Sequence, residues 1–312
     1  MEFKHVALLM TENCNAKCKM CCDSRGVVRG NTLSIPDIDF VLQNIKDVEQ
    51  ISTLGITGGE PMLYPGTVEH ILNYDFGRKF YVTLKTNGFW GIDPDKAEDF
   101  ICKNQKKISH ISLSYDAFHK EFIPVSALKS IISIASKYGI HTDVVGCFLK
   151  DDVRPGDILN EFGETAYYTD FCYQPVIKTG SANCFPEEKL LKLLETDQID
   201  IRCIAVSEPD ILINSHLDVY PCCSQVIENT LLNFGNLRDH NLSEIISDIM
   251  HNQVMFTIYT KGFSPFIEFM KKHGIPYPSH LASPCELCEF LFRSDWFLRE
   301  LDEHGFYSDL QS

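Results

Sequence analysis

The sequence predicts an α/β fold, a partial (β/α)6 TIM-like barrel followed by a smaller C-terminal region. Short apolar runs alternate with helical patterns in the first half of the chain, which is typical of βα units and a parallel sheet. Six such units are fewer than the eight of a closed barrel. The expected strands are His5–Thr11, Ile51–Thr57, Phe80–Thr86, His110–Tyr115, His141–Leu149 and Ala166–Val176, and the expected helices are Pro36–Gln50, Gly66–Tyr74, Asp93–Asn104 and Val125–Tyr138.

Local residue types predict where two of these helices begin or end and where the first region of the chain ends. Asp93 and Pro94 suit an N-cap and a first helical position, and Gly139 suits a C-terminal stop after Tyr138. Residues 178–187, KTGSANCFPE, have the composition of a loop. We therefore expect a barrel over residues 1–180 and a second region over residues 181–312.

Composition narrows the class of protein. The chain has 312 residues, 44% of them hydrophobic, and no apolar run near the about 20 residues that cross a bilayer. Without a signal peptide or membrane span, a cytoplasmic location is expected. A net charge of −15 argues against nucleic-acid binding. Thirteen cysteines in a reducing compartment favour metal or redox chemistry over disulfides.

A cysteine-rich loop follows the first expected strand. Cys14, Cys18 and Cys21 are spaced C-x3-C-x2-C, and Cys22 follows directly. Closely spaced thiolates suit zinc or an iron–sulfur cluster, but a structural zinc site wants four ligands, usually in pairs. The pattern resembles the loop of the radical S-adenosylmethionine (radical SAM) enzymes, which implies a 4Fe–4S cluster on Cys14, Cys18 and Cys21 whose fourth iron binds S-adenosylmethionine.

Three further strand ends carry polar residues. Gly58, Gly59, Glu60 and Pro61 match the GGEP motif that holds the methionine amino group in these enzymes, although Gly-Gly also occurs in ordinary turns. Asn87, Ser114 and Asp116 follow the next two strands and offer contacts to the ribose and the methionyl carboxylate. Capping and turn formation explain such residues equally well.

The second half has another cysteine set. Four closed cysteine ligands would also suit structural zinc. The pattern resembles instead the twitch or short SPASM extension, which implies an auxiliary 4Fe–4S cluster. The implied ligands are Cys203, Cys222, Cys285 and Cys288, with Cys22 competing with Cys203 for one place.

Cys223, which directly follows the predicted ligand Cys222, is assigned to neither cluster. Adjacent strand residues point to opposite sides, so Cys222 and Cys223 cannot easily serve one cluster. A buried apolar cysteine is the plain alternative, and it is the interpretation we give to Cys102, Cys147, Cys172 and Cys184, which have no motif around them. For Cys223 we favour a thiol that faces the substrate.

Short motifs along nearly the whole chain resemble the YydG-type radical SAM peptide epimerases. They are Thr86–Gly91, Ser114–Pro124, Tyr220–Ser224, Tyr259–Phe266 and the pair Cys285 and Cys288. In that group a cysteine matching Cys223 donates a hydrogen atom and an aspartate matching Asp210 helps hold the peptide. Cys203 stands further from Asp210 than the group's pattern, and the chain starts at the barrel with no leader-binding domain expected before it.

The resemblance implies an epimerase that converts L- to D-residues in a ribosomally synthesised precursor peptide. A 5′-deoxyadenosyl radical would remove the α-hydrogen, and Cys223 would return a hydrogen from the opposite face. An external electron donor of flavodoxin or ferredoxin type is implied as a partner, with no nucleic acid or membrane. Two alternatives stay open: a peptide maturase that forms a thioether or carbon–carbon crosslink, and a non-enzymatic zinc-binding protein.

Overall fold

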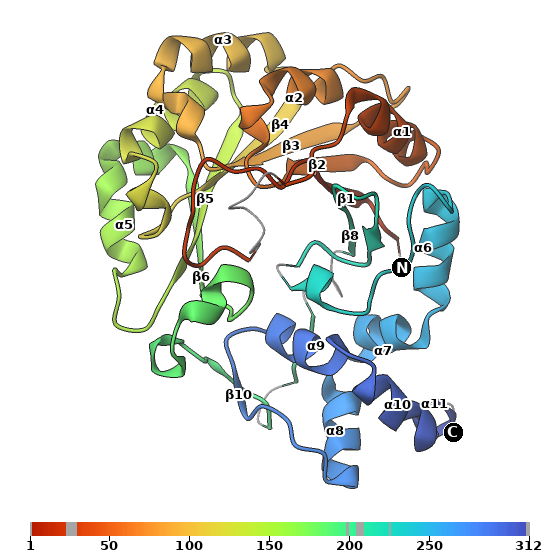
Figure 1. Ribbon diagram of the computed structural model, residues 1–312. Helices are drawn as coiled ribbons and strands as arrows, with labels where there is room; N and C mark the ends of the chain where they lie inside the picture. Colours follow the sequence, from red (N-terminus) through yellow and green to blue (C-terminus); the bar gives the residue numbers. More distant parts are fainter. Residues whose placement is uncertain (1, 23–29, 198–199, 204–208, 225, 310–312) are drawn as a thin grey trace.

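A parallel sheet forms the centre of the molecule (Figure 1). The computed structural model describes residues 2–22, 30–197, 200–203, 209–224 and 226–309. The six strands predicted from the sequence are present and pair in order, each parallel to the next. They are β1 (His5–Leu9), β2 (Thr53–Thr57), β3 (Tyr81–Thr86), β4 (Ile108–Ser114), β5 (His141–Phe148) and β6 (Asp170–Pro175).

Helices connect these strands and cover the outer face of the sheet (Figure 1). They are α1 (Ile35–Lys46), α2 (Pro65–Leu72), α3 (Pro94–Asn104), α4 (Val125–Lys137) and α5 (Pro155–Phe162). Asp93 caps α3 ahead of Pro94, and Gly139 adopts φ +69°, as the sequence predicted. Fully buried side chains such as Leu54 and Ile131 lie at this sheet–helix interface, where each contributes about 1.5–3 kcal/mol relative to an exposed position.

Two details of the first half differ from expectation. Helix α5 was not among the expected helices. The last expected strand begins late, because residues 163–168 form a 3-10 helix and pairing with β5 starts only at Asp170. Apolar composition alone placed the strand too early: Tyr167 is 88% exposed and belongs to no ladder.

The second half of the chain extends the same sheet. Strand β8 (Asp210–Ile213) lies parallel to β1 on the side away from β2, with Asp210 opposite His5. Strand β9 (Val219–Tyr220) then pairs antiparallel with β8. Residues 210–220 therefore belong to the central sheet in space, although the sequence placed them in a second region. The boundary at residue 180 stays a prediction.

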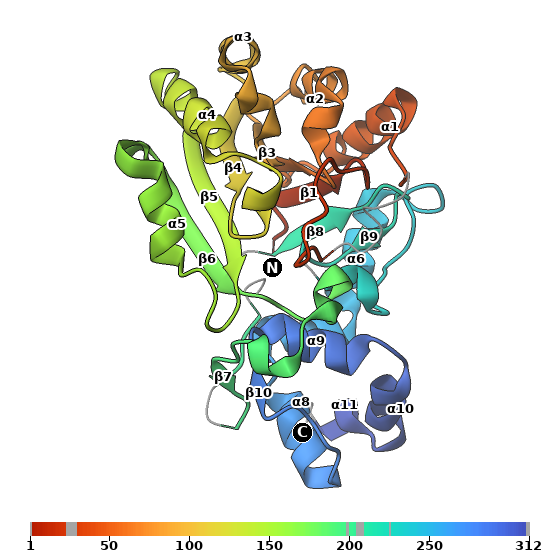
Figure 2. The same ribbon diagram turned by 60° about the vertical axis from the view of Figure 1, so that its left-hand side comes forward.

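The remaining C-terminal elements gather beside and below the barrel (Figure 2). They are α6 (Leu242–His251), α7 (Gln253–Lys261), α8 (Ser264–His273), α9 (Pro284–Phe292), α10 (Trp296–Glu303) and α11 (Phe306–Asp309), together with the two-stranded pair of β7 (Leu194–Glu195) and β10 (His280–Leu281). Buried phenylalanines around Phe266 pack α8, α9 and α10 together. Among the described helices, none combines the length and apolarity needed to cross a membrane.

Candidate active site

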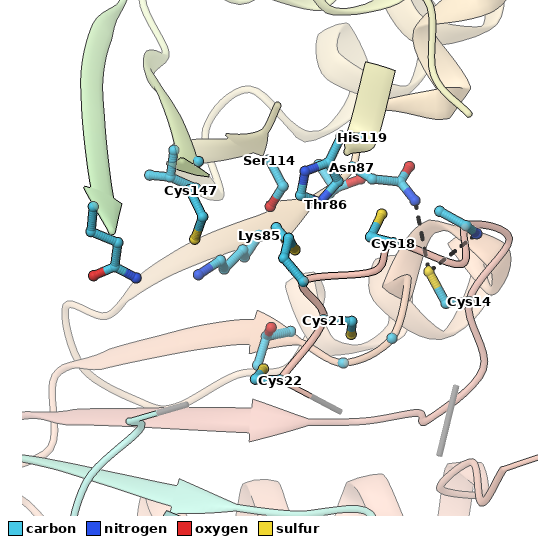
Figure 3. Close-up of a pocket in the computed structure, with 18 of the residues that line it drawn as sticks. Cys14, Cys18, Cys21, Cys22, Lys85, Thr86, Asn87, Ser114, His119 and Cys147 are labelled. Carbon is cyan, nitrogen blue, oxygen red and sulfur yellow. Dashed lines mark hydrogen bonds between the residues drawn. The ribbon is translucent and has the colours of Figure 1, made fainter. Parts of the chain in front are cut away.

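The cysteine loop after β1 opens onto a cavity of about 350 Å³. Cys14, Cys18 and Cys21 all line it, as does Cys22 (Figure 3). A backbone hydrogen bond from Cys21 N to Cys18 O (3.1 Å) closes the loop, and Ala16 N lies 3.4 Å from Cys14 Sγ. The loop thus presents three predicted ligands to one space at the carboxyl ends of the parallel strands, where such folds bind cofactors.

Two glycines after β2 hold this loop by close backbone approach. Gly59 N donates to Thr11 O at 2.6 Å, and Glu60 N donates to Asn13 O at 2.7 Å. A Cβ on Gly58 would lie 2.5 Å from Thr11 O, and one on Gly59 would lie 2.3 Å from Asn13 O. Both glycines also line the cavity. A side chain at either position would push the cysteine loop away.

Glu60 lies behind the cavity rather than in its lining. Its carboxylate is fully buried and accepts hydrogen bonds from Met62 N (2.9 Å), Thr86 Oγ1 (2.7 Å) and Asn87 N (2.6 Å). Burial raises its pKa to about 7, although these hydrogen bonds oppose the shift. Glu60 therefore ties the turn after β2 to the end of β3. Its expected contact with a ligand ammonium group stays a prediction.

Asn87 and Ser114 both line the cavity, and their expected contacts with a ligand stay a prediction. The Asn87 side chain donates to Asn15 Oδ1 at 2.8 Å and lies 3.9 Å from Cys14 Sγ. Gly88, the next residue, adopts φ +76° and lets the chain turn sharply at this point. The end of β3 therefore contacts the cysteine loop directly, while Ser114 at the end of β4 faces the cavity from another side (Figure 3).

Asp116 lies beneath the cavity and holds a residue that the sequence reasoning missed. Its buried carboxylate accepts from His119 Nδ1 at 2.9 Å, and His119 lines the cavity. Burial lowers the pKa of His119, but its hydrogen bonds to Asp116 and to Cys18 outweigh this and raise the pKa to about 10. The Asp-x-x-His spacing was the available signal, because it places both side chains on one turn.

The cavity wall formed by β3, β5 and β6 supplies further residues that the sequence did not single out. Lys85, Cys147, Cys172 and Gln174 all contribute to the lining. Cys172 is exposed, as are Cys102 and Cys184, so the interpretation of these three as buried apolar cysteines was wrong. Cys172 is exposed because it faces the cavity inside the barrel, which core side chains do not fill. Cys102 and Cys184 lie at the surface.

The second cysteine set converges from three separate segments. Cys222 is electrostatically coupled to Cys288 and Cys203, and Cys288 to Cys285. Burial is the largest cause that raises the pKa values of Cys222 and Cys288 well above the usual range. Within the described part of the chain, no three His, Cys, Asp or Glu side chains are grouped to hold one metal ion.

Cys223 pairs with Asp210 instead of joining that set. Its Sγ donates to Asp210 Oδ2 at 2.7 Å, and its backbone N donates to Asp210 Oδ1 at 3.0 Å. Burial and the adjacent carboxylate raise the pKa of Cys223 to about 12, while Lys85 lowers it slightly. Lys85 lines the cavity and its charge acts on Cys223, whereas Cys223 itself is not among the residues that line the cavity.

The parallel sheet carries the three-cysteine loop at its carboxyl edge, and this part of the chain is the part that a known family model matches. Residues 8–152 match the model of the Radical SAM superfamily. Such a domain implies S-adenosylmethionine and a 4Fe–4S cluster as cofactors. The donor set fits them: three cysteine thiols face one cavity that also carries glycine backbone, an amide and a hydroxyl.

The chain resembles one curated protein over most of its length. It is 24% identical over 300 residues to "Putative peptide biosynthesis protein YydG" of Bacillus subtilis (strain 168), covering 93% of this chain and 92% of that protein. Among solved structures, native anSMEcpe with bound AdoMet has a TM-score of 0.59 at 14% identity, covering 97% and 98% of the two chains. Streptococcus suis SuiB bound to precursor peptide SuiA has a TM-score of 0.56 at 15% identity, covering 83% and 67%.

Proposed function

We propose that this chain is a radical SAM peptide epimerase that converts L- to D-residues in a ribosomally synthesised precursor peptide. The similarity to a peptide biosynthesis protein over 93% of the chain supports a peptide substrate. The observation that carries the reaction type is the Cys223 thiol, which is held by Asp210 and on which the charge of the cavity-lining Lys85 acts. Asp210 was expected to hold the peptide, and its contact with Cys223 adds a positioning role.

Cys14, Cys18 and Cys21 would hold the first cluster, and Gly58, Gly59, Asn87 and Ser114 surround the space for S-adenosylmethionine. When bound, these cofactors supply an adenosyl radical that removes hydrogen from carbon. An auxiliary 4Fe–4S cluster is proposed on Cys222, Cys285 and Cys288, with Cys203 or Cys22 as the fourth ligand. Proximity of Cys203 to Cys222 and Cys288 favours Cys203, because Cys22 lines the first cavity.

Epimerisation requires the protein to hold two reacting groups on opposite sides of the substrate. Hydrogen removal and hydrogen return must occur on opposite faces of the same α-carbon, so the donor must stand across the substrate from the adenosyl group. Cys14 lies on the loop after β1, whereas Cys223 follows β9, and Lys85 of β3 is near both the cavity space and Cys223. A peptide in this space would therefore have Cys223 on one side. Hydrogen transfer from sulfur to the α-carbon completes the inversion and leaves a thiyl radical on Cys223. One electron from the external flavodoxin- or ferredoxin-type donor and one proton from solvent would return it to the thiol before the next turnover.

The test compares Cys223→Ala with wild type and with Cys102→Ala, a matched control at an exposed position of α3. The assay needs the precursor peptide, and a short open reading frame beside this gene is the place to look for it. Cys223→Ala should still form 5′-deoxyadenosine but yield no D-residues on chiral amino-acid analysis. Undiminished D-residue formation would remove Cys223 as the donor. A product lighter by two hydrogens would favour the crosslinking alternative.

A further inference from the structure

A lysine on the inner face of the barrel lines the cavity. Along β3 the residues alternate: Val82 and Leu84 are buried in the core, whereas Lys85 is exposed and borders the cavity. Within the described ranges, the Lys85 ammonium group forms no hydrogen bond or ion pair. The other basic side chain in the lining, His119, is held by Asp116 at 2.9 Å. Lys85 therefore presents to the cavity a positive charge that no described side chain neutralises by contact.

Two carboxylates that could attract Lys85 are engaged by other groups. Asp143 lies on β5, two strands from Lys85, and its Oδ1 is 3.3 Å from His110 Nε2. Asp210 accepts hydrogen bonds from the backbone and the thiol of Cys223. A lysine ammonium group carries hydrogen-bond donors and no acceptor, so it needs oxygen atoms from water or from a ligand. When a substrate displaces water from the cavity, Lys85 requires an oxygen atom of that substrate.

Lys85 also relates the cavity to the thiol proposed as the hydrogen donor. In Figure 3 its side chain extends into the space that Ser114, Cys147 and the cysteine loop surround. Its charge acts on Cys147, which lines the cavity, and on Cys223, which does not. A substrate that reaches from the cavity to Cys223 would therefore lie within reach of the Lys85 ammonium group.

We propose that Lys85 binds a backbone carbonyl oxygen of the precursor peptide beside the residue that is modified. The carbonyl carbon is bonded directly to the α-carbon, so a donor at this oxygen restricts the directions in which the α-hydrogen can point. Hydrogen bonds from a charged donor are about twice as strong as neutral ones. Lys85 thereby acts as a substrate-binding residue that orients the α-carbon. The inference rests on the proposed peptide substrate, but not on the epimerase reaction.

The charge of the whole chain favours a carbonyl over a carboxylate as the bound group. The net charge is −15, so an acidic peptide would be repelled on approach. A backbone carbonyl is present at each residue of a peptide and adds no net charge. Binding through the backbone provides affinity, whereas specificity comes from the side chains. Lys85 therefore contributes affinity and orientation, and it leaves the choice of side chain to other parts of the site.

The experiment measures the dissociation constant of the fluorescently labelled precursor peptide by anisotropy. The full-length protein is reconstituted anaerobically and loaded with S-adenosylmethionine, and reductant is left out so that no turnover occurs. Lys85→Met removes the charge and keeps a flexible, unbranched side chain, whereas Lys85→Arg keeps a charged donor. Lys106→Met is the matched control, because Lys106 is exposed and outside the cavity lining. The dissociation constant of S-adenosylmethionine is measured on the same proteins.

Lys85→Met should weaken peptide binding about tenfold, the effect of losing one hydrogen bond from a charged group. Lys85→Arg and Lys106→Met should stay near wild type, and S-adenosylmethionine should bind to all of these proteins alike. Equal peptide binding by wild type and Lys85→Met would overturn the proposal. Weakened binding of S-adenosylmethionine to Lys85→Met would also overturn it, because Lys85 would then serve the cofactor.

A second peptide, with its Asp and Glu residues replaced by Asn and Gln, separates the two classes of oxygen. The difference between wild type and Lys85→Met should persist with this peptide, because its backbone carbonyls are unchanged. Loss of the difference would move the contact to a side-chain carboxylate and overturn the carbonyl assignment. A crosslinked product in the activity assay would defeat the epimerase reaction but leave this comparison of peptide binding unchanged.

Discussion

The two cysteine regions of this chain are assembled in different ways. The first lies on one loop: Cys14, Cys18 and Cys21 span eight positions and face a cavity. The second draws Cys203, Cys222 and the pair on α9 from segments far apart in sequence, and none of the four lines that cavity. An accessible cluster site must leave room for a ligand, whereas an enclosed one needs only its own ligands. We infer that the first region performs chemistry on a bound molecule and the second supports it.

The largest effect is expected at the first region. Replacing Cys14, Cys18 and Cys21 together by Ala removes every ligand that the loop presents, so reductive cleavage of S-adenosylmethionine should fall to background. The measurement is 5′-deoxyadenosine formed with excess dithionite. Cleavage retained by the triple variant would contradict the assignment of the cluster to this loop.

Variants of the second region should lose iron while the cluster site of the first region is kept. Replacing Cys285 and Cys288 by Ala should lower the iron content by about one cluster, since enclosed sites need their full ligand set. The electron paramagnetic resonance signal that responds to S-adenosylmethionine should remain. Unchanged iron would mean that no auxiliary cluster is held at α9, and the contrast between the two regions would fail.

A tight contact at the end of the first cysteine loop gives a smaller effect. Gly180 adopts φ +55°, and a Cβ there would lie 2.1 Å from Cys22 O. Gly180→Ala should therefore destabilise the protein by about 1–3 kcal/mol and loosen the end of the cysteine loop. Gly156→Ala is the control, because a Cβ there meets nothing within 4 Å. Equal thermal unfolding of the two variants would show that residues 180 and 22 are not packed as described.

An effect of comparable size, spread over several pH units, is expected at Glu60. Its carboxyl ionises near pH 4.5 when unfolded and near 7 when folded, so the folded state binds more protons between these values. Stability should then fall as pH rises from about 4.5 to 7, by up to about 3 kcal/mol. Denaturant unfolding should show a flatter pH profile for Glu60→Gln. Parallel pH profiles for the two proteins would show that the pKa of Glu60 is not raised on folding.

The same contrast explains what the sequence could predict. The contiguous motif of the first region places Cys14 and Gly59 together, because both follow neighbouring parallel strands whose ends must meet. The convergence of Cys203 and Cys222 with α9 depends on β8 joining the sheet beside β1, and a four-residue strand has too little periodicity to reveal that pairing. His119 was missed because a short Asp-x-x-His spacing is common in turns, and only the fold shows that this ring is held by Asp116 and lines the cavity.

The central claim is that the second half supplies a hydrogen donor to a substrate held by the first. The most direct measurement is the mass of the peptide product formed in deuterium oxide. A thiol hydrogen exchanges with solvent, so hydrogen returned from Cys223 should add one deuterium to each D-residue formed, at the α-carbon. D-residues that carry no solvent deuterium would contradict the account, because their hydrogen would have come from a non-exchanging source.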